Sequence, residues 1–236
     1  MLNSDSAEKF NSSRAGEYEK QSRIALAGYE ACHELSACIL SAALGPGSTA
    51  NILVVGAGGG AQEIITAGSL EPNWQFTAVD PSQPMMDLAV VRLRESNLRN
   101  RTTLHVGYVN ELPLERRFDA ATLIGVLHHI PGDEAKRSIL KSISERLPEG
   151  APLILACNYY TYTSQPLFLS AWANRWRMQG AAPEEITEKL DRILQGADPP
   201  DSESVVISLL TDAGFQSVAR FFSSLFWGAW IAYRAP

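Results

Sequence analysis

The chain has 236 residues, of which 45% are hydrophobic and 19% are charged, and its formal net charge is −6. This size and apolar content suit one large domain with a sizeable core, while the acidic balance argues against a nucleic-acid surface, which needs clustered Lys and Arg. The sequence has no membrane-length apolar run, a polar N-terminal stretch without the apolar core of a secretion signal, and three cysteines without a CxxC pair. We therefore expect a reduced, cytoplasmic protein that does not span a membrane and holds no metal site.

The first segment in chain order has a helical pattern. Apolar side chains at helical spacing predict a helix from Arg14 to about Leu44 that Gly28 interrupts. Residues 1–47 are expected to form a helical lid beside the main domain. Tyr29 could close over a bound ligand and is a candidate catalytic residue.

Strands and helices alternate from residue 48 onward, which predicts a parallel sheet with crossover helices. The alternation stops at residues 158–201, which hold two helical patterns and are expected to form an insertion. Two final strand-like runs joined by Ser223 and Ser224 predict an antiparallel hairpin. Residues 48–236 are therefore expected to form one doubly wound α/β domain. The expected strands are Asn51–Val55, Gln75–Val79, Thr102–Val106, Phe118–Ile124, Pro152–Cys157, Ser217–Phe222 and Leu225–Tyr233, and helices are expected after Gln62 and Pro84 and over Asp133–Leu147 and Ser202–Ala213.

The stretch NILVVGAGGGA, from Asn51 to Ala61, is the most informative part of the chain. A buried strand runs into a glycine-rich turn, after which a helix begins. Glycines let the backbone approach a ligand closely, and N–H groups at the start of the helix face that ligand. Asp80 ends the next apolar strand, about 20 residues past the glycines, where an acid suits a ribose diol. The sequence therefore predicts a cradle for a nucleotide-like ligand.

These motifs, together with others in the same order, resemble the class I S-adenosylmethionine (SAM)-dependent methyltransferases. The glycine run resembles the family's GxGxG, residues 79–81 its ribose-binding strand end, and residues 107–113 its adenine-side loop. Residues 118–130 and 147–154 resemble its fourth strand and its entrance to the fifth. The resemblance implies a Rossmann-like seven-stranded sheet, SAM as methyl donor, S-adenosylhomocysteine as product and a small-molecule acceptor. The cofactor-binding residues that it implies are Gly56, Ala57, Gly58, Gly60, Asp80, Pro81, Met85, Tyr108, Val109, Ile124 and Gly125.

Two positions depart from the family's pattern. Many members carry an acid two residues before the first glycine, where this chain has Val54, and another acid after the loop glycine, where it has Tyr108. These departures motivate one alternative, a non-catalytic member that kept the fold for interaction. The spacing Gly56-x-Gly58-x-x-Ala61 also fits a dinucleotide fingerprint, so an NAD(P)-dependent oxidoreductase is a second alternative.

A closer resemblance concerns the carboxy-SAM synthases of wobble-uridine tRNA modification, and it gives a third alternative. It rests on Gly28-Tyr29, the two-helix insertion and the ending AGF…FF…LFWGAW. Those enzymes hold a carboxylate with an arginine shortly before the AGF turn. Here no Arg or Lys lies between Arg192 and Arg220, and an unpaired buried carboxylate is costly. We therefore expect ordinary SAM with its methyl group.

Methyl transfer from a sulfonium is an in-line displacement with a neutral leaving group, so positioning and water exclusion can supply much of the catalysis. A general base is needed only when the acceptor must lose a proton early. His128 and His129 follow the fourth strand at the carboxyl end of the sheet, where ligands bind, and are candidate bases. Tyr159, Tyr160 and Tyr162 begin the insertion and could line an acceptor pocket. The sequence leaves the acceptor unidentified and the assembly open between a monomer and a homodimer.

Overall fold

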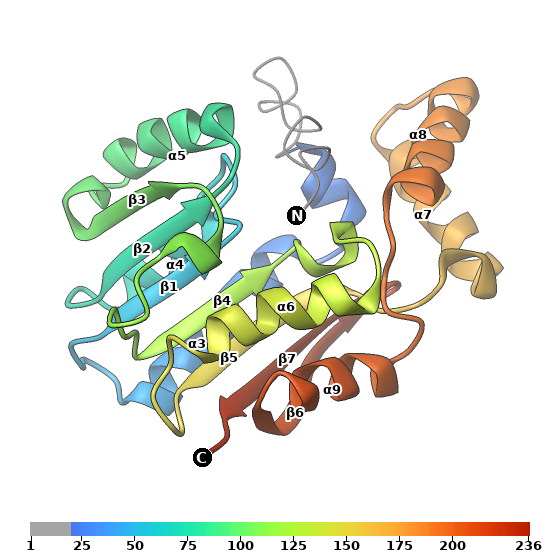
Figure 1. Ribbon diagram of the computed structural model, residues 1–236. Helices are drawn as coiled ribbons and strands as arrows, with labels where there is room; N and C mark the ends of the chain where they lie inside the picture. Colours follow the sequence, from blue (N-terminus) through green and yellow to red (C-terminus); the bar gives the residue numbers. More distant parts are fainter. Residues whose placement is uncertain (1–19) are drawn as a thin grey trace.

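The computed structural model describes residues 20–236, which fold around one seven-stranded sheet. The strand order is β3-β2-β1-β4-β5-β7-β6 (Figure 1). The first five strands are parallel, and β7 runs antiparallel between β5 and β6. The predicted doubly wound α/β sheet with an antiparallel C-terminal hairpin is confirmed. The strands are β1 (Asn51–Val55), β2 (Gln75–Asp80), β3 (Thr102–Val106), β4 (Ala120–Ile124), β5 (Pro152–Asn158), β6 (Phe215–Ser224) and β7 (Trp227–Arg234).

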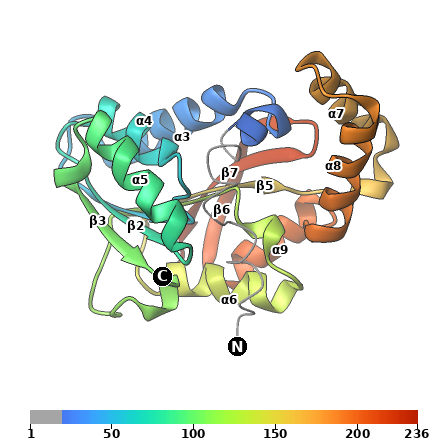
Figure 2. The ribbon, with the colours of Figure 1, turned by 90° about the horizontal axis from the view of Figure 1, so that it is seen from above.

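Helices cover both faces of the sheet, which Figure 2 shows nearly edge-on. One core cluster joins the sheet to α3, α4 and α5, and the other joins it to α6 and α9. Parallel strands that are buried on both faces read as continuous apolar runs, which explains the sequence of β1. The helices are α3 (Tyr29–Leu44), α4 (Gln62–Leu70), α5 (Gln83–Glu95), α6 (Asp133–Ser144), α7 (Pro166–Met178), α8 (Pro183–Gly196) and α9 (Glu203–Asp212).

Several predicted boundaries are wrong: the helix predicted over Asp133–Leu147 ends at Ser144, and the strand predicted over Ser217–Phe222 spans Phe215–Ser224. For two other boundaries the hydrogen bonds show the reason. The fourth strand begins at Ala120, because the amide of Phe118 donates to the carbonyl of Arg146 and does not join the ladder. The final hairpin turns at Leu225 and Phe226. Ser223 and Ser224, predicted to form the link, instead pair with β7, and Leu225 adopts the left-handed conformation with φ 51°.

The helical segment before the sheet is described only in part. Residues 20–25 form a helical turn, and α3 begins after Gly28, whose φ of 82° interrupts the helix as predicted. The first part of the helix predicted from Arg14 lies outside the described residues.

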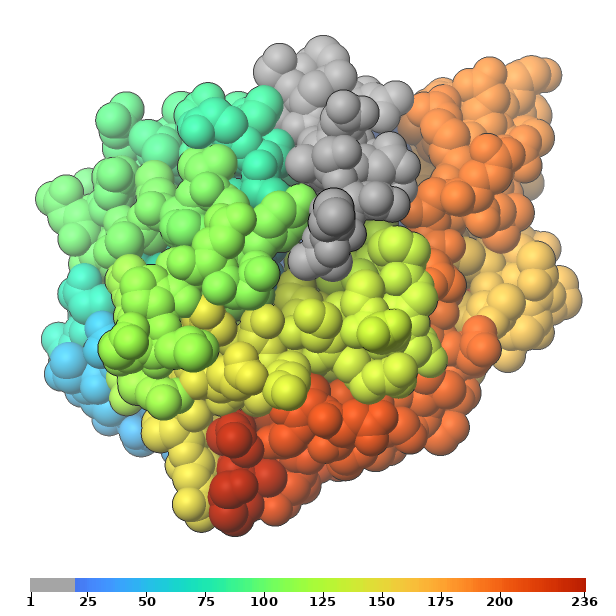
Figure 3. Space-filling model, in the orientation of Figure 1, coloured from blue at the N-terminus to red at the C-terminus, as the bar shows by residue number. Residues whose placement is uncertain are grey.

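The predicted insertion contains α7 and α8, which project as a lobe in the space-filling view (Figure 3). Two tryptophans of α7, Trp172 and Trp176, are buried. Trp172 Nε1 donates to the carbonyl of Ala25 at 2.5 Å, and Trp176 Nε1 donates to Gln21 Oε1 at 3.0 Å. The insertion therefore packs against the helical turn that precedes α3.

The far end of the insertion is fastened to the main domain by a buried lysine. Lys136, of which 1% is exposed, donates from Nζ to Asp198 Oδ2 at 2.8 Å, and the amide of Gly132 donates to the same oxygen at 2.7 Å. The amide of Asp198 donates to the carbonyl of His128 at 2.8 Å. Desolvation acts to raise the pKa of Asp198, but the bonds from Lys136 and Gly132 keep it below its usual value.

We expect Asp198→Ala to lower the free energy of unfolding by about 1.5–3 kcal/mol at pH 7, because the buried Lys136 ammonium would keep only Asp133 Oδ1, at 3.9 Å, as a counter-ion. Since the folded-state pKa of Asp198 is lowered, its contribution is present above the unfolded pKa of about 3.9 and is lost as pH falls through the folded pKa. Denaturant unfolding of both proteins between pH 7 and 4 measures this. Glu188→Ala, which breaks an exposed pair with Arg192, should cost about 0.5 kcal/mol or less. Equal losses for the two variants would contradict the role of the buried pair.

Candidate functional site

The glycine turn after β1 leaves no room for a side chain at its first position. Gly56 has a φ of 72°, and a Cβ atom there would lie 2.1 Å from Val126 Cγ2 in the loop after β4. The amides of Gly56 and Ala57 both donate to the carbonyl of Val79, at 2.7 and 3.2 Å. The turn is therefore fixed between the ends of β2 and β4, at the carboxyl edge of the sheet.

Asp80 ties the end of β2 to the same turn. Its Oδ2 accepts from the amide of Gly58 at 3.0 Å, and its Oδ1 accepts from the amide of Ser82 at 2.9 Å. Burial raises the pKa of Asp80, although both backbone bonds act to lower it. The structure thus brings together Asp80 and the glycines, as the sequence predicted.

A second carboxylate, which the sequence reasoning missed, follows the same glycine turn. Glu63 is a partly exposed residue in the first turn of α4, directly after the glycine turn. Burial first, and then the charge of Asp80, raise the pKa of Glu63 to about 8. Among residues 20–236, no Lys, Arg or His forms an ion pair with either carboxylate. An acid so soon after the glycines was the signal in the sequence that could have found it.

Two adjoining carboxylates without a cationic side chain suit a ligand that itself carries positive charge. Such a ligand would favour the ionised form of both acids. The sulfonium and ammonium groups of SAM meet this requirement. The carboxylate oxygens of Asp80 also keep lone pairs for ribose hydroxyls. The residues present therefore fit SAM.

The other predicted cofactor residues surround this turn. Met85 is 3% exposed, and its Sδ lies 3.5 Å from the place where a Cβ of Gly59 would be, so it supports the turn by packing. The remaining members lie at the same edge: Gly60 in the turn, Pro81 after β2, Tyr108 and Val109 after β3, and Ile124 and Gly125 at the end of β4.

The loop after β3 does contain an acid, although Tyr108 occupies the expected position. Glu111 Oε2 accepts from the amide of Tyr108 at 3.1 Å and lies 3.4 Å from His105 Nε2. A Cβ on Gly107, whose φ is 152°, would lie 2.1 Å from that oxygen. The carboxylate of Glu111 therefore bonds within its own loop, to the amide of Tyr108.

His128 and His129 lie in the 3₁₀ helix Leu127–His129 after β4. His128 is 4% exposed, its ring centroid is 5.0 Å from that of Trp227, and its Nδ1 accepts from the amide of Asn158 at 3.4 Å. Burial lowers the pKa of His128 well below its usual value, with a smaller effect from His129. The ring is therefore neutral at pH 7, and because Nδ1 accepts, Nε2 carries the proton.

Tyr29, the third candidate, begins α3. Its ring centroid lies 4.3 Å from that of His33, and the Arg23 guanidinium lies 4.7 Å from the same ring. Cys32 is on the same side of the helix, three residues further. Burial raises the pKa of Cys32 to about 12, and the charge of Glu63 adds to this effect. The start of α3 therefore lies near the second carboxylate.

Two of the three tyrosines at the start of the insertion belong to the core. Tyr159 and Tyr162 are 2% and 4% exposed. Tyr159 Oη accepts from Arg220 Nη1 at 2.9 Å, and Tyr162 Oη accepts from Asn158 Nδ2 at 2.7 Å. Only Tyr160 is partly exposed, so it alone keeps surface for an acceptor.

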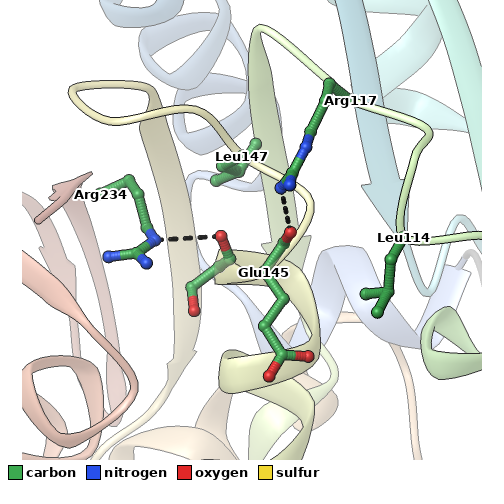
Figure 4. Close-up of a pocket in the computed structure, with 6 residues that line it drawn as sticks. Leu114, Arg117, Glu145, Leu147 and Arg234 are labelled. Atoms are coloured by element: carbon green, nitrogen blue, oxygen red, sulfur yellow. Dashed lines mark hydrogen bonds between the residues drawn. The ribbon is translucent and has the colours of Figure 1, made fainter. Parts of the chain in front are cut away.

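A cavity of about 330 Å³ lies at the other edge of the sheet (Figure 4). The segments that line it precede β4 and β5 or end the antiparallel β7, which places it away from the glycine turn. Both guanidinium groups in it already donate to backbone carbonyls. Arg234 donates to the carbonyl of Ser144, and Arg117 donates to the carbonyl of Glu145. This cavity does not belong to the site. It is lined by Leu114, Arg117, Ser144, Glu145, Leu147 and Arg234.

No helix among residues 20–236 is long and apolar enough to cross a membrane. No three His, Cys, Asp or Glu side chains of the described part gather as metal ligands would.

Residues 53–153 match the family model of a methyltransferase domain. Several solved structures share the fold at low identity. A putative O-methyltransferase from Nostoc punctiforme is 15% identical, with a TM-score of 0.63, 86% of this chain covered and 55% of that chain. An O-methyltransferase family 2 protein from Planctomyces limnophilus, in complex with apigenin, is 16% identical, with a TM-score of 0.60. The match covers 84% of this chain and 57% of that chain. Human N-acetylserotonin methyltransferase, in complex with SAM, is 16% identical, with a TM-score of 0.59. The match covers 86% of this chain and 52% of that chain. The chain thus spans little more than half of these proteins, and no curated protein matches it.

We expect Gly56→Ala to destabilise the fold by about 2–4 kcal/mol, because a methyl group would overlap Val126 in a left-handed conformation. Thermal and denaturant unfolding measure the loss. Gly196→Ala is the matched control, since its added Cβ meets no atom within 4 Å. A Gly56→Ala protein as stable as this control would show that the turn has more room than its geometry indicates.

Proposed function

We propose that this protein, which carries a class I SAM-dependent methyltransferase domain, transfers the sulfonium methyl group of SAM to a small-molecule acceptor. The observation that carries the proposal is the glycine turn bonded to Asp80, with Glu63 beside it and no cationic side chain of the described residues paired to either acid. The small acceptor is supported by similar folds in proteins named for such molecules, N-acetylserotonin and mitomycin among them.

In this proposal the turn and Asp80 hold the nucleoside of SAM. Asp80 accepts from the ribose hydroxyls, and Gly58 and Gly60 let the backbone approach the ligand. Tyr108 and Val109 flank the adenine, while Pro81, Ile124 and Gly125 complete the floor at the carboxyl edge of the sheet. When bound, SAM supplies a methyl group that is activated by its positively charged sulfur.

The protein's own contribution is mainly to position the acceptor and to exclude water. His128 is neutral and presents an N–H at Nε2, which suits it to hydrogen-bond an acceptor oxygen. His129, partly exposed beside it, is the proposed base for an acceptor that must lose a proton. Tyr29 would cover the cofactor from α3.

We assign the cover of the site to residues 1–47 and to the insertion at 158–201. The contacts of Trp172 and Trp176 with the helical turn before α3 support this, because they join the two parts into one structure. Loops and insertions carried by a rigid scaffold are where substrate choice is usually set. The acceptor would then bind between them.

Two alternatives are less well supported. The antiparallel pairing of β6 with β7 and the match of residues 53–153 to a methyltransferase domain argue against a nicotinamide dinucleotide. For carboxy-SAM, the first cation after Arg192 is Arg220, whose guanidinium is already engaged by Glu203 Oε2 at 3.1 Å and Tyr159 Oη at 2.9 Å. The donor proposed here is therefore SAM with its methyl group.

Asp80→Ala is expected to weaken SAM binding by about 1.5–3 kcal/mol, the scale of a hydrogen bond to a charged group. Isothermal titration calorimetry with SAM measures the loss. The control is Asp87→Ala on α5, an exposed acid that bonds only to Gln83 on its own helix. Unchanged affinity for Asp80→Ala would remove Asp80 from the cofactor site, and no binding by the wild type would end the proposal.

Glu63 should make SAM binding depend on pH. With its pKa near 8, Glu63 is protonated at pH 7, and a bound cation favours its ionised form, so binding should release a proton. Affinity should therefore rise as pH increases from 6 to 8. Calorimetry in buffers of different ionisation enthalpy counts the protons, and Glu63→Gln should release none. An equal release by the variant would locate the titrating group elsewhere.

A further inference from the structure

Two buried polar atoms without a partner lie opposite each other at the ends of β5 and β7. Within residues 20–236 the buried side-chain atoms that lack a hydrogen-bond partner include Asn158 Oδ1 and Trp227 Nε1. Asn158 and Trp227 are directly paired in the antiparallel ladder, so their side chains leave the sheet on the same face. Asn158 is 2% exposed and Trp227 is 8% exposed. An unsatisfied buried acceptor beside an unsatisfied buried donor is costly and calls for an explanation.

Both residues contact the neutral ring of His128. The backbone N–H of Asn158 donates to His128 Nδ1, and the Trp227 ring meets the His128 ring edge-on at 78°. The side chain of Asn158 is fixed as well, because its Nδ2 donates to Tyr162 Oη at 2.7 Å. The side-chain amide therefore cannot rotate away without losing this bond.

The pair also adjoins the cofactor side of the domain. A Cβ on Gly125, at the end of β4, would lie 3.8 Å from Trp227 Cη2. Gly125 is partly exposed and belongs to the floor assigned to SAM. The Trp227 ring therefore adjoins the end of β4, on the cofactor side of the sheet as proposed above.

We infer that Asn158 and Trp227 bind a hydroxyl group of the acceptor, with the O–H donating to Asn158 Oδ1 and the oxygen accepting from Trp227 Nε1. This inference rests on the proposed function and adds the class of acceptor, an alcohol or phenol on an apolar body. Asn158, Trp227 and the Nε2–H of His128 determine its specificity.

A hydroxyl is the group that satisfies both atoms at once. It is donor and acceptor in a single atom, whereas an ether or ketone only accepts and an ammonium only donates. A hydroxyl would also fit if the Asn158 amide were turned over, since it could then accept from Nδ2. Much of the surroundings is apolar, because Tyr162 and Trp227 belong to the larger hydrophobic core cluster.

The test follows the indole N–H signals by ¹⁵N–¹H NMR in the full-length protein loaded with S-adenosylhomocysteine. The chain has five tryptophans, and Trp227→Phe identifies the signal of Trp227. Phenol is the probe, with anisole and toluene as probes of similar shape that lack the O–H. Phenol should shift the Trp227 indole proton downfield, while toluene should not. Trp227→Phe should weaken phenol binding by about fivefold to tenfold, the scale of one neutral hydrogen bond.

The matched control is Trp230→Phe, also on β7, whose Nε1 already donates to Glu203 Oε1 at 3.0 Å. Its phenol affinity should equal that of the wild type. Equal shifts with phenol and toluene would mean an apolar pocket only, and a Trp227 signal that no probe moves would mean a resident water; both outcomes overturn the inference. Calorimetry with S-adenosylhomocysteine on the same samples keeps this result separate from the proposed function, which fails only if that ligand does not bind.

Discussion

The site depends on the contacts that hold the glycine turn against the ends of its neighbouring strands. The carbonyl of Val79 accepts from two turn amides, and Asp80 accepts from a third. Since Gly56 has no side chain, Val126 can close over it. The loop after β4 is thereby positioned, and that loop carries His128. One arrangement of backbone thus brings the glycine turn, Asp80 and His128 to the carboxyl edge of the sheet.

Charge then selects what this edge can bind. A helix start with free N–H groups is ordinarily attractive to anions. Here Asp80 occupies the Gly58 amide with its own carboxylate, and Glu63 adds a second acid in the first turn of α4. Burial makes the ionised form of each acid unfavourable, as their raised pKa values show. A cationic ligand would relieve this cost, which is why we propose SAM as the ligand of this edge.

Local patterns predicted the sheet and the glycine turn well, because apolar runs and glycines act over a few residues. β1 and β3 have the predicted bounds, and Asp80 meets Gly58 as expected. The sequence missed what arises only on packing. The pKa of Glu63 is raised because the neighbouring elements bury it. The turn at Leu225 was missed because a buried Phe226 occupies a position where polar residues are usual.

The pairing of Asn158 with Trp227 could not be predicted for the same reason, since only the antiparallel register brings them together. The same residue, Asn158, also links the insertion to His128. The insertion begins after Asn158 and ends near Asp198, and both residues bond to His128, one at the ring and the other at the carbonyl. Movement of the insertion would therefore displace His128 and the acceptor side. Asp80 and the glycine turn, held by bonds within the sheet, would stay in place. The described contacts thus distinguish the glycine turn, which bonds within the sheet hold in place, from His128, which both ends of the insertion contact.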